Sequence, residues 1–323
     1  MSNKRTVKYT TSMVKCFKQC RKKYELEYVE ELKPIKTPKA LELGTLYHKG
    51  LEMLLYGLDL TNIRGELEVF QRNACLDNGV DYDPIPVGMA FEMVKCFDRE
   101  SGWQNWNIKN VEKTFEVSTG YGKRLVGKID VVIEHEDRYY IIEHKSTTQW
   151  GTDGNEYLHN LLWDEQPTNY LYAIKKMIED GATDIPEVVG VFYCVVEKCG
   201  LKPFLATPMD KRKYTQTGAL YASQREEDES AEEYLQRVAA WYAEKPRLHM
   251  HFVYRTPQEI TDRIEDLNLV FRDMAECEKN ATYYRNPSAC QILDCAFRPK
   301  CLENTADTDC LFIKKKARNE ELL

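Results

Sequence analysis

The sequence lacks several features that would place it in a specialised class of protein. None of its apolar runs approaches the ~18–20 residues that a membrane helix needs. The N-terminal stretch has no apolar core of the kind that secretory signals carry, and we find no internal repeat and no low-complexity tract. With 43% hydrophobic and 30% charged residues, the composition excludes disorder, collagen and coiled coil for the whole chain. We therefore expect a cytoplasmic globular protein of one elaborated domain or two.

The chain also lacks an excess of positive charge. Its 45 basic and 52 acidic residues give a net charge of -7, which argues against a surface that coats nucleic acid non-specifically. The charge is uneven, because residues 1–23 contain Lys and Arg but no acid, residues 225–233 are strongly acidic, and residues 314–318 are basic again. A local basic groove built from both basic clusters would require the two ends of the chain to meet.

Hydrophobic periodicity predicts helices at both ends of the chain and strands between them. Apolar spacing predicts helices over 11–30 (capped by Thr11 or Ser12), 40–56, 61–78, 86–98 and 157–179, and a mostly helical segment over 215–285. Alternation and turn residues predict consecutive antiparallel strands over 111–117, 125–134 and 139–146, and a further strand over 188–197. We therefore expect an α/β (mixed α+β) fold with a small sheet flanked by helices. An N-terminal helical arm (1–110) and a C-terminal helical arm (211–323) would bracket a core at 111–210.

A predicted hairpin brings charged groups together. On a strand, Glu143 and Lys145 project to one face and His144 to the other, and Asp130 on the preceding strand can point to the same side as Glu143. Burying such charges beside apolar residues is costly unless they pair or bind a cation, and carboxylates are preferred ligands of Mg²⁺ and Mn²⁺. Taken alone, these residues are better interpreted as an ordinary Glu–Lys ion pair on a surface hairpin, because such spacings recur by chance.

Motifs on either side of the hairpin add to this pattern. The D-x12-E-x-K spacing lies within GKIDVVI and YIIEHKS, the segment LGTLYHKGLE precedes it, and Gln166-x3-Tyr170 follows it. In this order, the motifs resemble those of the PD-(D/E)XK nuclease superfamily, and most of all its RecB-like exonuclease branch, with its G-T-x-x-H and Q-x3-Y motifs. One early Cys and a C-terminal Cys triplet resemble the iron–sulfur subset of that branch, which includes AddB-type, CRISPR-adaptation and phage exonucleases. The resemblance runs from about residue 12 to residue 301.

The resemblance implies a metal site. Asp130 and Glu143 would hold a divalent ion, and His48 would add an imidazole ligand that favours Mn²⁺ somewhat over Mg²⁺. The backbone carbonyl of His144 would be a further ligand, while Glu112, one strand earlier, would support the site from behind the ligands. Without the resemblance, His48 is better interpreted as a core histidine on an apolar helix face. The remaining histidine side chains receive no role, namely those of His135, His144, His159, His249 and His251.

The resemblance also implies catalytic and DNA-binding residues. Lys145 would orient or activate the attacking water, and Gln166 and Tyr170, one helical turn apart, would face the site or the DNA backbone. Ordinary helix packing is the alternative for both, and it is strongest for Tyr170. Four basic residues of the first helix would track the DNA backbone without reading bases, namely Lys15, Lys18, Arg21 and Lys22.

Eleven cysteines are many for a cytosolic chain, in which disulfides are disfavoured. Most are scattered in apolar stretches and are interpreted as small buried hydrophobes, whereas the resemblance assigns Cys20, Cys290, Cys295 and Cys301 to a [4Fe–4S] cluster, with Zn²⁺ as the alternative. The gap between Cys290 and Cys295 is four residues where the family has two, so Cys310 or Cys16 could replace one ligand. A cluster would join the first helix to the C-terminal tail.

The sequence thus predicts a metal-dependent DNA exonuclease that hydrolyses phosphodiester bonds of linear or single-stranded DNA. By resemblance, we expect it to act in phage or mobile-element recombination or DNA processing, with recombination proteins as partners. We expect no membrane contact. Two alternatives keep the fold: a non-catalytic DNA-binding scaffold, and a redox regulator whose functional site is the iron–sulfur cluster. Intact Asp130, Glu143 and Lys145 argue against the scaffold.

Overall fold

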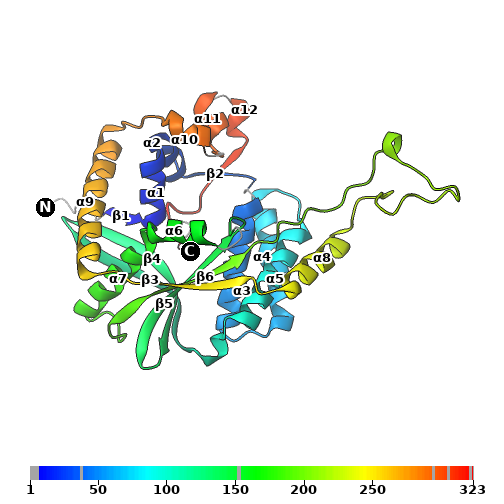
Figure 1. The fold of residues 1–323 in the computed structure, drawn as a ribbon. Helices are drawn as coiled ribbons and strands as arrows, with labels where there is room; N and C mark the ends of the chain where they lie inside the picture. Colours follow the sequence, from blue (N-terminus) through cyan, green and yellow to red (C-terminus); the bar gives the residue numbers. More distant parts are fainter. Residues whose placement is uncertain are drawn as a thin grey trace.

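The computed structural model describes residues 7–36, 39–150, 154–292, 295–303, 306–319 and 322. It confirms the predicted fold class, because a central mixed sheet is flanked by helices (Figure 1). The strands are β1 (Val7–Thr10), β2 (Leu32–Pro34), β3 (Asn107–Gly120), β4 (Lys123–His135), β5 (Arg138–Thr147), β6 (Val188–Glu197), β7 (Leu248–Val253) and β8 (Phe312–Lys314).

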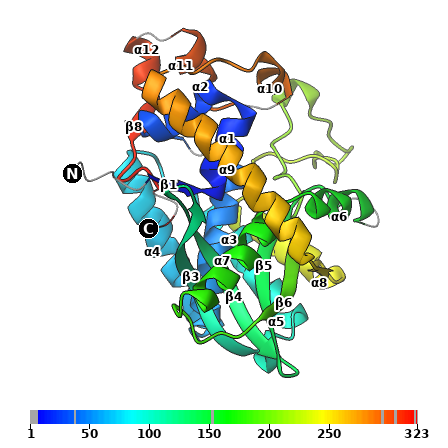
Figure 2. The same ribbon diagram turned by 90° about the vertical axis from the view of Figure 1, so that its left-hand side faces the viewer.

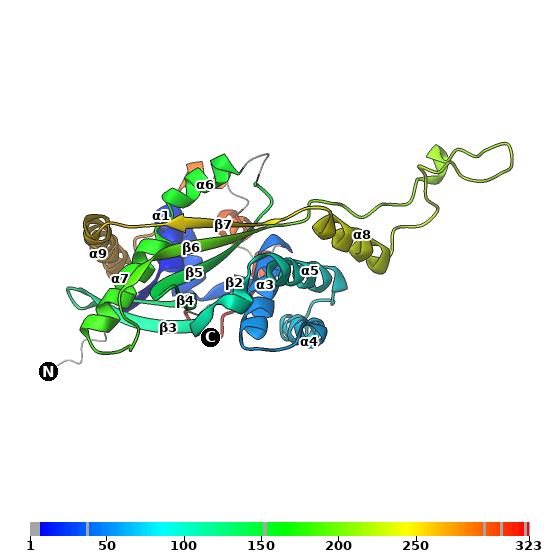
Figure 3. The same cartoon turned by 60° about the horizontal axis from the view of Figure 1, so that its bottom comes forward.

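The helices pack on both faces of the main sheet (Figure 3). The N-terminal part contributes α1 (Thr11–Gln19), α2 (Arg21–Tyr24), η1 (Glu25–Val29), α3 (Lys39–Leu55), α4 (Leu60–Asn78), α5 (Pro84–Glu100) and η2 (Trp103–Asn105). The rest contributes α6 (Asn155–Leu162), α7 (Gln166–Glu179), η3 (Met209–Lys211), α8 (Ala231–Glu244), α9 (Pro257–Asn280), α10 (Pro287–Ile292), α11 (Arg298–Leu302) and α12 (Ala306–Asp309). Helices α3 and α5 cover one face, with α8 packed on α5, and α1, α7 and α9 cover the other.

Strand β4 is the central element of the main sheet. It pairs antiparallel with β3 along almost its whole length, while its other edge is shared by two strands. Its first residues, 123–126, pair in parallel with β1, and its last residues, 131–135, pair antiparallel with β5. Between these stretches, residues 127–130 have no partner among the described strands on that edge. The sheet then continues through β6 to β7.

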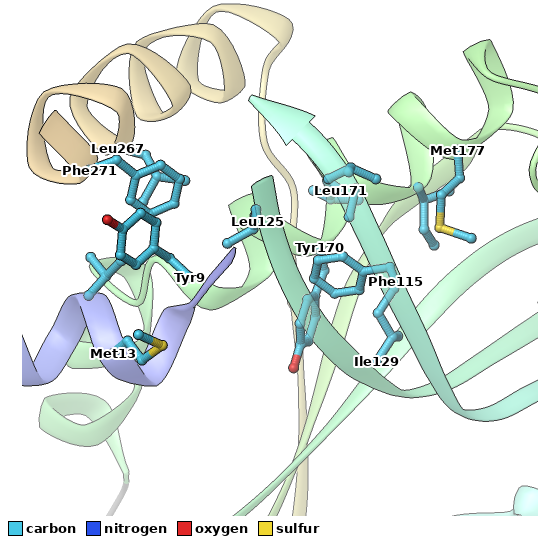
Figure 4. Packing of buried hydrophobic residues seen from close by; sticks show 14 of the residues in the cluster. Tyr9, Met13, Phe115, Leu125, Ile129, Tyr170, Leu171, Met177, Leu267 and Phe271 are labelled. Carbon is cyan, nitrogen blue, oxygen red and sulfur yellow. The ribbon is translucent and has the colours of Figure 1, made fainter. Parts of the chain in front are cut away.

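The two cores on either side of the sheet fix the helices. On one side, Tyr9 of β1 stacks on Phe271 of α9 with ring centroids 4.6 Å apart, beside Phe115 and Tyr170 (Figure 4). On the other side, α3 and α5 approach so closely that a Cβ at Gly50 would lie 2.7 Å from Val94 Cγ2. Both cores consist mainly of buried, closely packed side chains. The sheet between them, which carries the charged residues described below, is therefore held rigidly.

The predicted hairpins and the helices over 40–56, 61–78 and 86–98 are confirmed, but three other predictions were wrong in part. The segment 215–285 holds only the two helices α8 and α9, and β7 lies between them. The helix over 157–179 is two helices, broken at residues 163–165. The helix over 11–30 breaks at Cys20, whose φ of -162° and ψ of 116° are extended, and its cap is Thr10, whose Oγ1 accepts from the Met13 amide at 3.1 Å.

The two ends of the chain meet, as a shared basic surface would require. Strands β2 and β8 pair antiparallel, with Leu32 opposite Lys314, and Figure 2 shows the C-terminal helices α11 and α12 beside α2 of the N-terminal part. Two of the C-terminal cations contact tyrosines of the N-terminal part there. Lys315 lies over the Tyr28 ring at 4.1 Å, and Arg318 donates to the Tyr24 hydroxyl at 2.6 Å. The sheet also draws β1 and β7 from the two predicted arms. Within the described residues, no helix is long and apolar enough to cross a membrane.

Candidate active site

The candidate site lies where β4 and β5 separate. Their last pair is Val131 with Ile142, after which β5 continues along β6 alone. Asp130 and Glu143 are therefore the first residues beyond the paired stretch. The His144 amide, which no longer has a β4 carbonyl to bind, donates to Asp130 Oδ2 at 2.9 Å. A backbone donor is satisfied in this way, and the carboxylate is held at the split.

Three ligand-type side chains from three elements converge on this point. His48 of α3, Glu112 of β3 and Asp130 of β4 place one ligand atom each within 4.8 Å of one another. His48 Nδ1 is 3.7 Å from Asp130 Oδ2, and Glu112 also pairs with Lys128 at 3.0 Å. In the sequence analysis we predicted Glu143 in this group and Glu112 behind it, whereas the geometry groups Glu112 with the other two.

The backbone explains the position of Glu112. Val111 pairs with Val131 and Lys113 with Ile129, so Glu112 lies beside Asp130. Its φ is 51°, a left-handed conformation that costs a non-glycine residue of the order of 1–3 kcal/mol and that persists where the surroundings over-determine it. With this backbone conformation, Glu112 departs from the regular alternation of side chains along β3, and its carboxylate lies with His48 and Asp130.

A hydrogen-bonded chain extends from Glu143 to α7. Lys145 Nζ donates to Glu143 Oε1 and to Gln166 Oε1, both at 2.7 Å, and Gln166 Nε2 donates to the Tyr170 hydroxyl at 2.6 Å. Asp164 Oδ2 lies 3.6 Å from Lys145 Nζ. Glu143 Oε2 is buried and has no hydrogen-bond partner among the described residues. The helix residues thus hold the ammonium while one carboxylate oxygen is left unsatisfied.

Burial and crowding perturb the charges. Burial, with Glu112 nearby, raises the pKa of Asp130 to about 7. Burial, with Asp130 nearby, raises the pKa of Glu143 to about 7. Burial alone would lower the pKa of Lys145, but the Glu143 and Asp164 carboxylates outweigh it and raise that pKa above its usual value, so Lys145 stays an ammonium. Burial lowers the pKa of His48, although solvent still reaches 37% of its side chain, and this favours a neutral imidazole.

This donor set fits a hard divalent cation. The carboxylates repel one another, one buried carboxylate oxygen lacks a partner, and a neutral imidazole faces Asp130. A cation would relieve each of these unfavourable features. Carboxylate oxygens with an imidazole suit Mn²⁺ and Mg²⁺. The alternation predicted for β5 also holds, because the His144 ring lies on the opposite face, 5.1 Å from Phe97.

We expect the metal-free protein to lose stability as the pH rises toward neutrality. Asp130 and Glu143 have pKa values of about 7 in the folded protein, above the ~4 of the unfolded chain. The folded state therefore binds more protons between these values, and stability falls from pH ~4 to pH ~7 and then levels. Thermal unfolding in EDTA checks this. The exposed turn variant Asp137→Asn should keep the slope and Asp130→Asn should reduce it; equal slopes would contradict the prediction.

The predicted cluster cysteines line a cavity of about 360 Å³. Its lining contains Cys20, Cys290, Cys295 and Cys301 together with Lys23, Arg285 and Arg298, but neither Cys16 nor Cys310. Cys16 instead contacts Glu27, with its sulfur 3.7 Å from Oε2. Arg285 Nε donates to Cys301 Sγ at 3.3 Å. The break in the first helix at Cys20 is therefore at the wall of this cavity.

Another cavity, of about 610 Å³, adjoins Lys145. Of the predicted DNA-binding residues, Lys15 and Lys18 line it. Arg21 and Lys22 do not: the Arg21 guanidinium lies over the Phe17 and Tyr284 rings, and Lys22 pairs with Glu25. The same cavity contains residues to which the sequence analysis gave no role, Trp163 and Asp164. Neither belongs to a motif, and only the interruption between two amphipathic helical segments could have indicated them.

The chain is similar to a crystal structure described as a "putative exonuclease" from Eubacterium rectale, with 10% identity, a TM-score of 0.47, and coverage of 88% of this chain and 85% of that chain. No curated protein gives a significant match. The model of a protein family described as "PD-(D/E)XK nuclease superfamily" matches residues 8–302. The chain therefore belongs to the PD-(D/E)XK nuclease superfamily.

Proposed function

We propose that the protein is a metal-dependent exonuclease of the RecB-like branch that hydrolyses phosphodiester bonds of linear or single-stranded DNA. The observation that carries the proposal is the convergence at the β4–β5 split. There, His48, Glu112 and Asp130 form a ligand group, and beside it Lys145 Nζ pairs with Glu143 Oε1 at a distance of 2.7 Å. His48, Glu112, Asp130 and the unpartnered oxygen of Glu143 would hold Mn²⁺ or Mg²⁺, with the His144 carbonyl as a further ligand. When bound, the ion would polarise the phosphate and lower the pKa of water.

The chain's own residues supply the other roles. Lys145 remains an ammonium, so it cannot accept a proton; it can donate hydrogen bonds to a phosphate oxygen and stabilise the charge that develops there. Gln166, which accepts one Lys145 proton and donates to Tyr170, fixes the direction of that ammonium. Glu143 links the two groups, because its Oε1 accepts from Lys145 while its Oε2 is left to hold the ion.

We further propose that the cysteine cavity holds a [4Fe–4S] cluster. No three cysteine sulfurs in the described part of the chain lie within 4.8 Å of one another, whereas four thiolates around one Zn²⁺ at ~2.3 Å stand ~3.8 Å apart. The wider spacing favours a polynuclear centre. Lys23, Arg285 and Arg298 surround the sulfurs and would offset the negative charge of four thiolates. The cluster would join the segment after α1 to α10 and α11.

Degradation of end-labelled linear DNA tests the nuclease proposal. We expect wild type to release label with Mn²⁺ or Mg²⁺ and not with EDTA, and to leave a circular single strand intact if it acts from ends. Lys145→Met removes the ammonium and keeps the aliphatic chain, so the rate should fall by ~10²–10³-fold. Lys176→Met, which removes an ion-paired lysine of α7, is the matched control. DNA binding without cleavage by the cluster-loaded protein would favour the scaffold alternative.

A further inference from the structure

An exposed tryptophan stands at the edge of the cavity that adjoins Lys145. Trp163 ends α6, and 77% of the residue is exposed. Single exposed apolar side chains are common on proteins, so its exposure alone says little. The second observation is its position, because Trp163 lines the cavity of about 610 Å³ that also contains Lys145. The adjacent residue, Asp164, contacts the Lys145 ammonium.

The two walls of this cavity differ in chemistry. Helix α1 contributes a polar and basic wall, with Thr11, Lys15, Lys18 and Gln19. The other wall, from α6 and the break before α7, contributes Tyr157, Leu161 and Trp163 together with the polar Asn160, Asp164 and Glu165. A basic wall opposite an aromatic one is the combination by which proteins bind a strand of nucleic acid, with the phosphates on one side and base faces on the other.

The acidic groups of the cavity are already neutralised by protein cations. Glu165 pairs with Lys18 at 2.5 Å and with Arg263 at 2.9 Å. Asp164 faces Lys145 and accepts from the Tyr193 hydroxyl at 3.1 Å. Lys15 is exposed and forms no ion pair with the residues that the structure describes. A free ammonium therefore remains for a phosphate at the outer part of the cavity, and Lys145 lies at its inner part.

We propose that this cavity binds the end of single-stranded DNA, with Trp163 stacking on an unpaired base while Lys15 and Lys145 face the flanking phosphates. The proposal rests on the nuclease function proposed above and specifies its substrate. Bases inside a duplex are stacked on both faces, so an indole at the edge of a cavity can stack only on an unpaired base or on the terminal pair of a duplex. The cavity volume is in the range of ~300–1,000 Å³ that encloses small molecules. A duplex is too wide to enter such a cavity, because its major groove alone is ~12 Å wide.

Binding of labelled oligo(dT) in EDTA tests the proposal without any cleavage. We expect Trp163→Ala to raise the Kd by about tenfold to hundredfold, the usual effect of losing one stacked base, and Trp163→Phe to restore most of the affinity. Because the side chain is exposed, Trp163→Ala should fold normally. Tyr121→Ala, at a β3–β4 turn residue that is 92% exposed, is the matched control and should bind like wild type. Lys15→Ala should reduce the salt dependence of binding, and Trp163→Ala should not.

Each outcome separates this proposal from the nuclease function. Wild-type hydrolysis of bis(4-nitrophenyl) phosphate with Mn²⁺ reports the chemical site with no base present. If wild type hydrolyses it but Trp163→Ala binds oligo(dT) normally, the strand-binding proposal is wrong and the nuclease stands. If oligo(dT) binding depends on Trp163 but no phosphodiester is hydrolysed, the nuclease proposal fails and the strand site stands. The assignment to single-stranded DNA would be overturned if Trp163→Ala weakened the binding of a blunt duplex as much as that of oligo(dT). It would also be overturned if wild type bound oligo(U) more tightly than oligo(dT).

Discussion

Asp130→Asn is expected to lower activity and to raise the stability of the metal-free protein. Asp130 is 8% exposed, and the acids Glu112 and Glu143 lie beside its carboxylate. Asn keeps an oxygen that can accept the His144 amide at the same position, but it removes one buried negative charge. At pH ~8 we therefore expect a gain of ~1–3 kcal/mol in the free energy of unfolding, the order of magnitude for a poorly compensated buried polar group. Cleavage should fall by at least ~10³-fold, because the group that would orient both metal and phosphate is lost.

Thermal unfolding with EDTA and with Mn²⁺ separates the two effects. Wild type should melt lower than Asp130→Asn in EDTA and should gain stability on adding Mn²⁺, since an ion that binds only the folded state stabilises it. Asp130→Asn should gain little. The exposed Asp137→Asn variant should match wild type in both conditions. A metal-free Asp130→Asn protein that melts below wild type, or that gains as much from Mn²⁺, would show that Asp130 is a structural residue and not a metal ligand.

The local part of this site was predictable from the sequence. Strand alternation places Glu143 and Lys145 on one face, and the short turn before β5 brings Asp130 near them. These relations span few residues and depend on backbone geometry that all strands share. The four-residue spacing of Gln166 and Tyr170 likewise fixes one helix face. Such features needed no knowledge of tertiary contacts.

The role of Glu112 could not be predicted in this way. Its proximity to His48 and Asp130 depends on a φ of 51° in the middle of a strand. No pattern of residue types indicates a left-handed Glu, because the conformation is imposed by the neighbouring strands and helices. The separation of β4 from β5 was hidden for a related reason. It depends on β1, a strand of four residues that pairs with positions more than one hundred residues further along the chain.

The helix breaks show a similar limit. Hydrophobic periodicity continues through Cys20 and through Trp163–Glu165, so each pair of helices was predicted as one. In the structure both interruptions lie at cavities: Cys20 at the cysteine cavity and Trp163 at the cavity beside Lys145. Local rules describe the regular parts of the chain, and they fail where tertiary structure places a side chain at the wall of a cavity.

Cys20→Ser is expected to cause a large loss of iron and of thermal stability. Cys20 comes from the break after α1, whereas Cys290, Cys295 and Cys301 come from the tail. Beside the cavity, the tail is anchored by a small apolar group, Leu26, Phe297 and Phe312. A cluster bridging both segments would therefore supply much of the free energy that holds the tail in place. Losing one of four thiolates should lower the iron content and the visible absorbance of anaerobically purified protein, and it should lower the melting temperature.

Cys310→Ser is the control, because Cys310 is exposed and does not line the cavity. It should keep its iron, its absorbance and its melting temperature. Limited proteolysis should cut the tail of Cys20→Ser and spare that of Cys310→Ser. Because Lys15 and Lys18 lie on the helix that ends at Cys20, loosening this junction should also weaken oligo(dT) binding. Equal iron content in both variants would remove Cys20 from the ligand set, and a colourless wild type with stoichiometric zinc would replace the cluster with Zn²⁺.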